Sequence, residues 1–599
     1  MPGAVDVCLA VPRLELDRPF TYLLPDGIDT PTGTLVSVPF HGRTVKGWVL
    51  GPAAEVPAKV VRVRRVLSRV PVFTPADLRL YRWVSERYVA PLGTVIDRAH
   101  PPRVASEEGR GPTPVPPVSI PSTPSVLEGY GGGRDLVAAC RSGSGTFVLR
   151  PLPDHEAAAC VEAVAACLAG GRDALILVPE AEPLPATARA IAEAFGAAAL
   201  MFAGGEARDR YRMWLDLLAS RYRVVVGTRP AVFAPLRALG LVWVNREAHP
   251  GHREERAPYH HVREVAMARA HLEAAACVLA AHSPSAAAAA LPDRGEAGVV
   301  RASRQRERAA APLVETVRPQ DEDRSPRLGT LVAGARTAFL LVSRRGYGVA
   351  RVCRTCGEPA RCAVCAGPVA VRRGWAACTV CGAEGRCPAC GGTSFGLERG
   401  GTERVREWAA RITGREVALV ESGDRATPPS GLVVGTAAGV KDFGALRLGL
   451  VAVLDADRAR RRAGLTAPEQ VLATWFEAAA WAGTRSDGGR VLVQTREPGD
   501  PAVQALVRWD PWHFHRAERR RLEEAGFPAG FPVFRVLGGA ELPTRLRVAD
   551  PVTLLDSGER DQTVCLVTVR PDGLERFRAT VLNLVREGIV RRVEAEPQL

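Results

Sequence analysis

The sequence predicts a multidomain α/β protein. Its 599 residues are enough for about four domains. Two long stretches alternate short apolar strands with helices, which is typical of parallel sheets covered by helices. A dense group of cysteines interrupts the second stretch, and hydrophobic residues make up 46% of the chain, an ordinary value for a globular protein. The length excludes a small module that is held together only by disulfides.

The charge balance is strongly basic. Lys and Arg number 79 against 65 Asp and Glu, so the net charge is +14, and the only lysines are Lys46, Lys59 and Lys441. This surplus favours a polyanionic partner, most simply nucleic acid, with a solvated basic surface as the alternative. No run of about 18 apolar residues is present and the N-terminus lacks a signal-peptide pattern, so we expect a cytoplasmic protein without a membrane partner.

The N-terminal part divides into a domain and a linker. Residues 1–100 alternate short apolar strands, such as VDVCLAV and TLVSVPF, with turns, and they end in the helical stretch PADLRLYRWVSERYV. This pattern predicts a small β-rich domain. Residues 101–144 begin with a run rich in Pro, Ser and Gly that buries little apolar surface, so we predict a linker there.

Strands and helices alternate through most of the remaining chain. The runs FVLR, ALILVPE and LGLVWVN, separated by helical segments, predict a first α/β lobe over residues 145–315. A second lobe is predicted over residues 330–352 and 391–497, with the cysteine-rich segment 353–390 inserted into it. Residues 498–599 end in a β-α-β pattern, which predicts a small α+β domain.

The inserted segment contains eight cysteines in four Cys-x-x-Cys pairs. Two residues between cysteines let a tight turn aim both thiolates at one ion, and zinc takes four such ligands in a tetrahedron. We therefore predict two closed, structural zinc sites, with an iron–sulfur cluster as the weaker alternative. The symmetric spacing favours nested pairing over sequential pairing. The outer four ligands are Cys353, Cys356, Cys387 and Cys390, and the inner four are Cys362, Cys365, Cys378 and Cys381.

Three separate stretches resemble the primosomal protein N′ (PriA) family. AFLLVSRRGYGVARVCRTC, the later cysteine pairs and GGTERV are similar to its second motor lobe, ALILVPE and VVVGTRPAVFAPL to its first lobe, and VPRLELDRPFTYLLPDG to its N-terminal DNA-binding domain. The resemblance implies two helicase-like (RecA-like) α/β lobes, a two-zinc insert in the second lobe, and a protein that restarts stalled replication forks. The family's winged-helix domain would fall near residues 101–145, where we predict that it is absent or reduced.

The family normally acts as an ATP-driven 3′-to-5′ DNA helicase, but its motifs for ATP hydrolysis are degenerate here. After FVLR, where a phosphate loop with a Lys is needed, the chain has residues 151–156, PLPDHE. The acidic Mg²⁺ motif aligns with residues 245–248, NREA, and the arginine-finger motif with residues 483–487, GTRSD. We therefore assign no catalytic and no nucleotide-binding residue and predict a scaffold that binds DNA without unwinding it, with residual ATP binding left open.

The resemblance also implies DNA contacts in the N-terminal domain. The matching positions are Phe20, Thr21, Gly42 and Lys59, which in the family capture the 3′ end of a strand at a fork. Thr21 stands where the family has Asp, so an acceptor for the 3′-hydroxyl is kept without its charge. A core Phe, a turn Gly and a solvated Lys are the structural alternatives for three of these positions.

The predicted function is replication restart, in which the chain binds branched or forked DNA and single-stranded DNA and helps to assemble the primosome. The protein partners that the resemblance implies are a single-strand-binding protein and the primosome and helicase-loading proteins. The alternatives are an active ATP-dependent 3′-to-5′ helicase and a zinc-containing interaction scaffold without DNA binding. Arginine clusters that start at Arg62, Arg458 and Arg516 either contact phosphate or form solvated faces.

Overall fold

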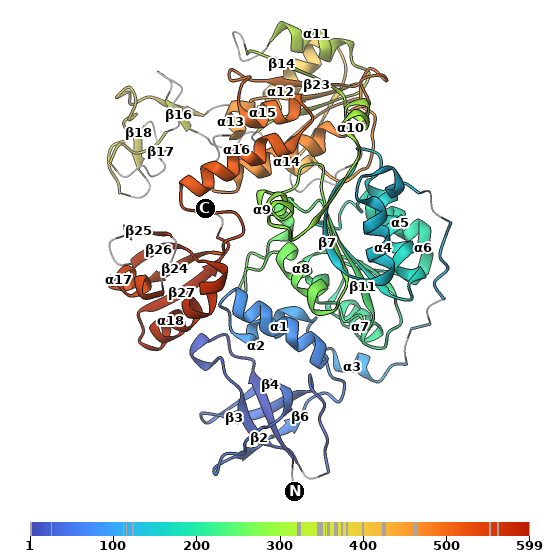
Figure 1. Ribbon diagram of the computed structural model, residues 1–599. Helices are drawn as coiled ribbons and strands as arrows, with labels where there is room; N and C mark the ends of the chain where they lie inside the picture. Colours follow the sequence, from blue (N-terminus) through green and yellow to red (C-terminus); the bar gives the residue numbers. More distant parts are fainter. Residues whose placement is uncertain are drawn as a thin grey trace.

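The computed structural model describes residues 3–597 with several internal gaps. The gaps are residues 26, 112, 115–116, 123–124, 320–324, 344–350, 354, 356–359, 365–368, 373–374, 379–380, 398–400, 422–426, 461–463, 550–552 and 560–561. Within the described part, four sheets of four or more strands mark four structural units, and two two-stranded sheets lie in the cysteine-rich segment (Figure 1). No described helix is long and apolar enough to cross a lipid bilayer.

The N-terminal unit is a six-stranded sheet followed by two helices. Alternate residues of the first strand, Val5 and Val7, are buried because successive side chains of a strand point to opposite faces. The sheet has the order β5-β2-β1-β4-β3-β6. Its strands are β1 (Ala4–Leu9), β2 (Phe20–Leu23), β3 (Leu35–Phe40), β4 (Arg43–Pro52), β5 (Val61–Arg62) and β6 (Arg65–Val66), and the helices are α1 (Pro75–Arg87) and α2 (Leu92–Ala99).

A capping box starts helix α1. The Thr74 hydroxyl accepts a hydrogen bond from the Asp77 backbone N–H at 3.3 Å, and the Asp77 carboxylate accepts one from the Thr74 N–H at 2.8 Å. Pro75 follows at the first helical position, where its missing N–H costs nothing. The buried face of α1 and α2 joins the hydrophobic core of the first lobe, so the N-terminal unit is fixed to that lobe.

The segment 101–144 differs from the predicted linker. Helix α3 (Ala105–Glu108) lies against the first lobe, where Glu107 pairs with Arg208 at 2.6 Å and Thr113 donates a hydrogen bond to Asp216 at 2.6 Å. Helix α4 (Gly133–Ser142) packs on a helix of that lobe through Leu136 and Cys140. The first lobe therefore starts before residue 145, because α4 has an apolar face that needs a partner.

The first lobe is built on a parallel sheet with the order β13-β7-β12-β11-β8-β10-β9. Its strands are continuous apolar runs because helices cover both faces. Helices α4, α5 and α6 cover one face, and α8 with α1 covers the other. The strands are β7 (Gly145–Arg150), β8 (Asp173–Leu177), β9 (Ala199–Phe202), β10 (Val224–Gly227), β11 (Leu239–Asn245), β12 (Ala276–Ala280) and β13 (Gly298–Arg301). The helices are α5 (Glu156–Ala169), α6 (Ala186–Phe195), α7 (Ala207–Leu218), α8 (Val262–Leu272), α9 (Ala286–Ala290) and α10 (Arg304–Ala310).

The second lobe is a parallel sheet with the order β14-β23-β22-β15-β21-β20. Its strands are β14 (Leu313–Val317), β15 (Ala338–Leu341), β20 (Val417–Val420), β21 (Leu432–Gly435), β22 (Leu450–Val453) and β23 (Arg490–Gln494). Helices α11 (Pro326–Gly334) and α12 (Gly401–Thr413) cover one face. The other face is covered by α13 (Ala456–Arg460), α14 (Ala467–Ala479), α15 (Pro501–Val507) and α16 (Pro511–Glu524).

Two boundaries of this lobe differ from the predicted ones. Strand β14 pairs with β23, so the second lobe starts at Leu313 and not after residue 315. Helices α15 and α16, predicted as part of the C-terminal domain, bury Val503, Leu506 and Phe514 in the core of the second lobe. The sequence predicted these elements correctly but not their partners, because an apolar helix face does not show which sheet covers it.

The C-terminal unit is a small α+β domain, as predicted. Its antiparallel sheet has the order β25-β26-β24-β27, and α18 packs on it through Phe577 and Val581. The domain contacts the N-terminal unit, where Asp17 pairs with Arg578 at 3.3 Å (Figure 1). Its elements are β24 (Val533–Gly538), α17 (Leu542–Leu546), β25 (Thr553–Glu559), β26 (Gln562–Thr568), α18 (Leu574–Arg586) and β27 (Val590–Ala595).

Candidate DNA-binding, metal and inter-lobe sites

An aromatic cluster lies at one end of the N-terminal sheet. The rings of Phe20 in β2 and Phe40 in β3 meet edge to face at 5.1 Å, and Phe40 contacts His41 at 4.5 Å. His41 and Gly42 form the turn between β3 and β4, and Gly42 adopts φ +75°, which only Gly adopts without strain. The structure therefore brings the turn at Gly42 next to Phe20.

Lys59 belongs to the same end of the sheet. Strand β5 pairs in parallel with β2, with Val61 opposite Tyr22. Lys59 stands two residues before Val61, as Phe20 stands two residues before Tyr22. The guanidinium of Arg18 lies 4.9 Å from the centre of the Phe20 ring. Arg18 and Lys59 are exposed, and neither pairs with a carboxylate among the residues that the structure describes. The end of a DNA strand can stack its base on an aromatic ring and place its phosphate against a free cation beside that ring.

Thr21 has a carboxylate partner that the sequence did not reveal. Its hydroxyl donates a hydrogen bond to Asp6 of β1 at 2.8 Å, because β1 and β2 pair with Asp6 directly opposite Thr21. Both residues are half-buried at the sheet surface. An acidic acceptor is thus present beside Thr21, although Thr21 itself carries no charge. The only sequence signal for Asp6 was an acid at an outward position of the strand VDVCLAV.

Two cysteine triads form in the inserted segment. Cys353 lies with Cys387 and Cys390, and Cys362 lies with Cys378 and Cys381, and within each triad all sulfur atoms lie within 4.8 Å of one another. This grouping is the nested one and not the sequential one. The predicted fourth ligands, Cys356 and Cys365, lie outside the described residues.

The sulfur distances fit a metal better than a disulfide. The Sγ atoms of Cys353 and Cys390 are 3.5 Å apart and those of Cys362 and Cys381 are 3.6 Å apart. A tetrahedral zinc ion with Zn–S bonds of about 2.3 Å separates its sulfurs by about 3.8 Å. A Cβ atom at Gly392 would come to 3.3 Å from the sulfurs of both Cys353 and Cys390, so the backbone of this turn lies close to the triad. The triads are therefore able to hold one metal ion each.

The two antiparallel ribbons of the insert carry these triads. Strand β16 (Arg351–Cys353) pairs with β19 (Phe395–Leu397), and β17 (Val369–Arg372) pairs with β18 (Trp375–Cys378). Cys353 and Cys378 are the last residues of β16 and β18, so each ribbon delivers one sulfur at a strand end. The described part of the insert lies to the side of the second lobe in Figure 1.

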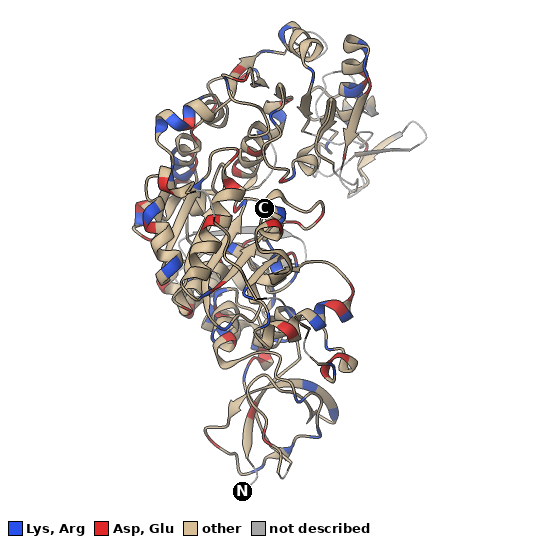
Figure 2. Ribbon diagram, turned by 90° about the vertical axis from the view of Figure 1, so that its right-hand side faces the viewer, with Lys and Arg blue, Asp and Glu red and all other residues tan. Residues whose placement is uncertain are grey.

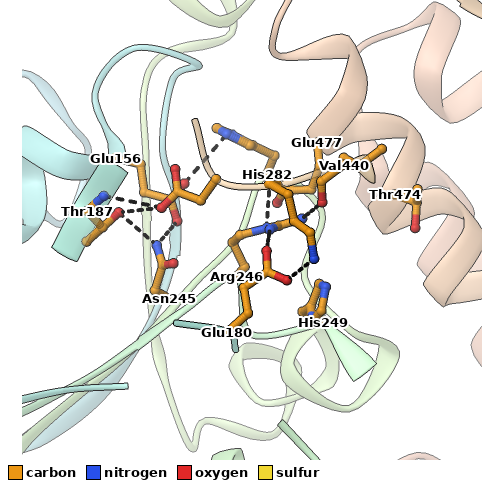
Figure 3. Close-up of polar contacts among 12 residues, drawn as sticks. Glu156, Glu180, Thr187, Asn245, Arg246, His249, His282, Val440, Thr474 and Glu477 are labelled. Carbon is orange, nitrogen blue, oxygen red and sulfur yellow. Dashed lines mark hydrogen bonds and ion pairs between the residues drawn. The ribbon is translucent and has the colours of Figure 1, made fainter. Parts of the chain in front are cut away.

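The seam between the two lobes is filled by the chain's own charged side chains (Figure 3). Glu156 is the first residue of α5, directly after the segment that replaces the phosphate loop. Its carboxylate is buried and accepts a hydrogen bond from the Asn245 side chain at 2.8 Å. Burial, and then the carboxylates of Glu477 and Asp442, hold the pKa of Glu156 well above its usual value. A helix N-terminus favours an anion, but the raised pKa disfavours the charged form of Glu156, so the chain fills this position with its own carboxyl group and not with a fixed negative charge.

Arg246 crosses the seam from the end of β11. Its guanidinium pairs with Glu180 of the first lobe at 3.3 Å and with Glu477 of the second lobe at 3.1 Å, and it donates a hydrogen bond to the carbonyl of Val440 at 3.1 Å. Only 3% of this side chain is exposed. The arginine therefore occupies the position of the family's acidic motif and connects the lobes.

A second set of contacts crosses the same seam. Lys441 pairs with Glu180, and Asp442 accepts hydrogen bonds from the Thr187 backbone N–H at 3.2 Å and its hydroxyl at 3.1 Å. The carbonyl of Asp442 also accepts the N–H of Ala186 at 2.8 Å. A residue of the second lobe thus caps the N-terminus of α6 in the first lobe.

The acid that remains in the degenerate motif is also engaged within the chain. Glu247 is fully buried and accepts hydrogen bonds from Arg263 at 2.6 Å and from the hydroxyl of Ser285 at 2.8 Å. The third degenerate motif lies elsewhere, since Arg485 is exposed and lines a different cavity between α10 and α15. The arginine of that motif is therefore not in the seam.

The space left in the seam is small and acidic. A cavity of about 130 Å³ is lined by Asp154, Glu156, Asp442 and Glu477, with Lys441 as the one lysine. Sites that enclose a small organic ligand are usually about 300–1,000 Å³. Burial lowers the pKa of His282 beside this cavity, so its imidazole contributes no positive charge at neutral pH.

Relatives of the chain agree with this architecture. Residues 6–101 match the family model for the 3′ DNA-binding domain of PriA. The chain is 34% identical over 585 residues to the Probable replication restart protein PriA of Mycobacterium tuberculosis (strain CDC 1551 / Oshkosh), with 91% of this chain and 88% of the relative covered. The chain belongs to the PriA family of replication restart proteins.

More distant PriA relatives match as well. The replication restart protein PriA of Treponema pallidum is 27% identical and is covered to 84% of its length by 86% of this chain. That of Bacillus subtilis is 24% identical over 61% of this chain and 50% of the relative. A solved DEAD-box helicase bound to ssRNA and UDP-BeF aligns with 62% of this chain at a TM-score of 0.36 and 8% identity, a similarity too low to carry a comparison of the sites.

Proposed function

We propose that the chain binds DNA at stalled or branched replication forks and helps to assemble the primosome without ATP-driven unwinding. Membership of the PriA family and the matched 3′ DNA-binding domain support the restart role and the DNA contact. The observation that carries the absence of unwinding is the seam, where Glu156 and Arg246 take the places of the phosphate-binding lysine region and the Mg²⁺-binding acid.

Three features of this seam oppose ATP hydrolysis. The terminal phosphates need donors and a cation at the N-terminus of α5, but Glu156 places an acid there. Mg²⁺ needs a free carboxylate after β11, but Asn245 and Arg246 stand there and Glu247 is bound to Arg263. A triphosphate would also have to displace the cross-lobe pairs of Arg246 and Lys441. Each of these features costs several kcal/mol of the stabilisation that phosphoryl transfer requires, so we expect no ATP turnover.

DNA capture uses the N-terminal cluster in this proposal. Phe20 stacks on the terminal base, Lys59 and Arg18 contact phosphate, and the turn at Gly42 lets the strand end approach the backbone. Thr21 and Asp6 accept the hydrogen bond of a free 3′-hydroxyl. The bound DNA is branched, forked or single-stranded.

The two cysteine triads, completed by Cys356 and Cys365, hold two structural zinc ions. Bound zinc supplies only cross-linking, because four thiolates leave no position for water. The stabilised insert contacts partners such as a single-strand-binding protein and helicase-loading proteins in the cytoplasm. Metal analysis of the purified chain should find two zinc ions, and iron with visible absorbance would contradict the assignment.

A steady-state ATPase assay with forked DNA tests the proposal. We expect turnover at the level of buffer with or without a fork, while the same preparation binds the fork. Turnover in the range of about 1–100 s⁻¹ that phosphoryl-transfer enzymes show would instead indicate an active motor. A preparation that neither turns over ATP nor binds forks across a salt series would indicate an interaction scaffold.

A further inference from the structure

A basic cavity lies at the hinge between the lobes, away from the seam. Its volume is about 460 Å³, and it is lined by α10, by the crossing segment Ala311–Pro312 and by the turn at Arg485. The end of α15, with Arg508 and Trp509, closes the remaining side. Figure 1 shows α10 and α15 at the opposite end of the molecule from the N-terminal sheet. The cavity is therefore separate from the proposed site around Phe20.

Three exposed arginines line this cavity without a counter-ion. Arg308, Arg485 and Arg508 come from α10, the turn before β23 and the end of α15. Among the residues that the structure describes, no carboxylate pairs with any of these three guanidinium groups. Like charges that share a cavity repel one another, so a bound anion stabilises the arrangement.

The other charged groups at the cavity are already used by the fold. Arg304 donates hydrogen bonds to Glu307 at 3.2 Å and to the carbonyl of Trp509 at 2.8 Å. Asp510 caps α16 by accepting the N–H of Trp512 at 3.2 Å. The charges of Arg304 and Asp510 offset each other, so the three remaining arginines set the net positive charge of the cavity.

An apolar wall faces the arginines. Pro312, Val314, Val507 and Trp509 line the same cavity, and 36% of Val507 is exposed. A small anion such as chloride has no apolar group that could contact this wall. A nucleotide, in contrast, carries apolar sugar and base atoms next to its phosphate. Arginine presents a planar fork of donors that matches phosphate oxygens in pairs.

We infer that the hinge cavity binds a nucleotide phosphate, with Arg308, Arg485 and Arg508 as its ligands. A DNA strand and a free nucleotide share this chemistry, and the test separates them. Both lobes contribute to the cavity, and the N–H of Arg485 already donates to the carbonyl of Ala311 at 2.9 Å. A bound phosphate therefore adds a contact between the lobes that does not involve Arg246.

The first test is the salt dependence of binding to a single-stranded oligonucleotide. The hinge variant carries Arg308→Gln, Arg485→Gln and Arg508→Gln in the full chain. The control variant carries Arg141→Gln, Arg404→Gln and Arg411→Gln. It removes three exposed arginines that form no ion pair among the residues that the structure describes, and it gives the same net charge. Each lost phosphate contact lowers the slope of log Kd against log salt by about 0.7 for a single strand.

We expect the slope of the hinge variant to fall by about 2, and its affinity to fall on the order of tenfold, with a clearly smaller change in the control. Replacing the same three residues by Lys should restore most of the slope, because charge is kept. Equal slope changes in the hinge and control variants would report only net charge and would exclude a DNA strand at this cavity. Equal slope changes together with unaltered dAMP binding would overturn the inference.

The second test measures dAMP and inorganic phosphate binding by calorimetry. Loss of dAMP binding in the hinge variant, with the oligonucleotide slope unchanged, would assign the cavity to a free nucleotide. If the hinge variant and the control variant have the same dAMP affinity and the same oligonucleotide slope, the cavity does not bind a nucleotide phosphate. Because dAMP binding does not need a fork, this arm reports on the cavity even if the chain fails to bind forks as proposed above.

Discussion

The cluster around Phe20 and the seam around Arg246 both lie where the PriA family has functional motifs, but their charges are satisfied differently. Arg18 and Lys59 are exposed and, among the described residues, have no carboxylate partner. Arg246 is 3% exposed and pairs with a glutamate from each lobe. The first arrangement leaves cations free for a ligand, whereas in the second a ligand must first break internal ion pairs. This difference is the basis of our proposal that the chain kept its DNA contact and lost its nucleotide site.

The overall charge gives no such distinction. Figure 2 shows Lys and Arg spread over the molecule and interspersed with Asp and Glu, without a single basic stripe. The net charge of +14 therefore does not locate a DNA path by itself. Local pairing of each cation is the more informative observation.

Breaking the seam should give the largest effect. Arg246→Ala leaves Glu477 without its buried partner and Glu180 with Lys441 alone, so the free energy of unfolding should fall by about 3 kcal/mol. Denaturant unfolding measures this, with the exposed Arg404→Ala as the matched control. Fork affinity should stay within about twofold of the unmodified chain. A variant as stable as that control would show that the seam is not held by these pairs.

Breaking the N-terminal cluster should give the opposite pattern. Phe20→Ala removes a stacking partner, so binding to a fork with a free 3′ end should weaken by about 1–3 kcal/mol while the unfolding midpoint changes little. Fluorescence anisotropy measures the affinity, and the half-buried Phe531→Ala serves as the control. An equal loss of affinity in both variants would show that Phe20 makes no specific contact with the DNA.

A pH series can sharpen the description of the lobe contact. Glu469 of α14 accepts the N–H of Ala286 in α9 at 2.6 Å, and burial, ahead of all other causes, raises its pKa to about 7. The folded chain therefore binds this proton more tightly than the unfolded chain, whose carboxyl titrates at 4.5. The resulting stability is fully present below pH 4.5 and is lost as the pH rises through about 7.

The thermal midpoint should consequently fall more between pH 5 and pH 8 in the unmodified chain than in Glu469→Gln. Differential scanning calorimetry at several pH values measures both. Parallel curves for the two proteins would show that Glu469 does not titrate in this range.

The smallest expected effect concerns the 3′ end. Asp6→Asn keeps the size of the side chain but removes its charge next to Thr21, so the preference for a 3′-hydroxyl over a 3′-phosphate should fall by about 1 kcal/mol. Paired anisotropy titrations with the two ends measure the preference, and Asp29→Asn in the same unit is the control. A preference unchanged in Asp6→Asn would assign the end contact to other groups.

Much of the architecture followed from local sequence patterns. The strands β7, β8 and β11 appear close to where their apolar runs predicted them, because a buried parallel strand must be continuously apolar. The Cys-x-x-Cys spacing likewise indicated paired sulfur ligands, because two intervening residues make a tight turn. The sequence also predicts the loss of the lysine-bearing phosphate loop, since no lysine lies near residues 151–156.

Only the tertiary structure decided which distant groups meet. It placed α15 and α16 on the second lobe, set Asp6 opposite Thr21, and brought Arg246 to Glu477 across more than two hundred residues of chain. A sequence pattern fixes which face of an element is apolar or charged, but not the partner of that face. That partner is set by the packing of whole sheets and helices, and with it whether a charge is free for a ligand or buried in a pair.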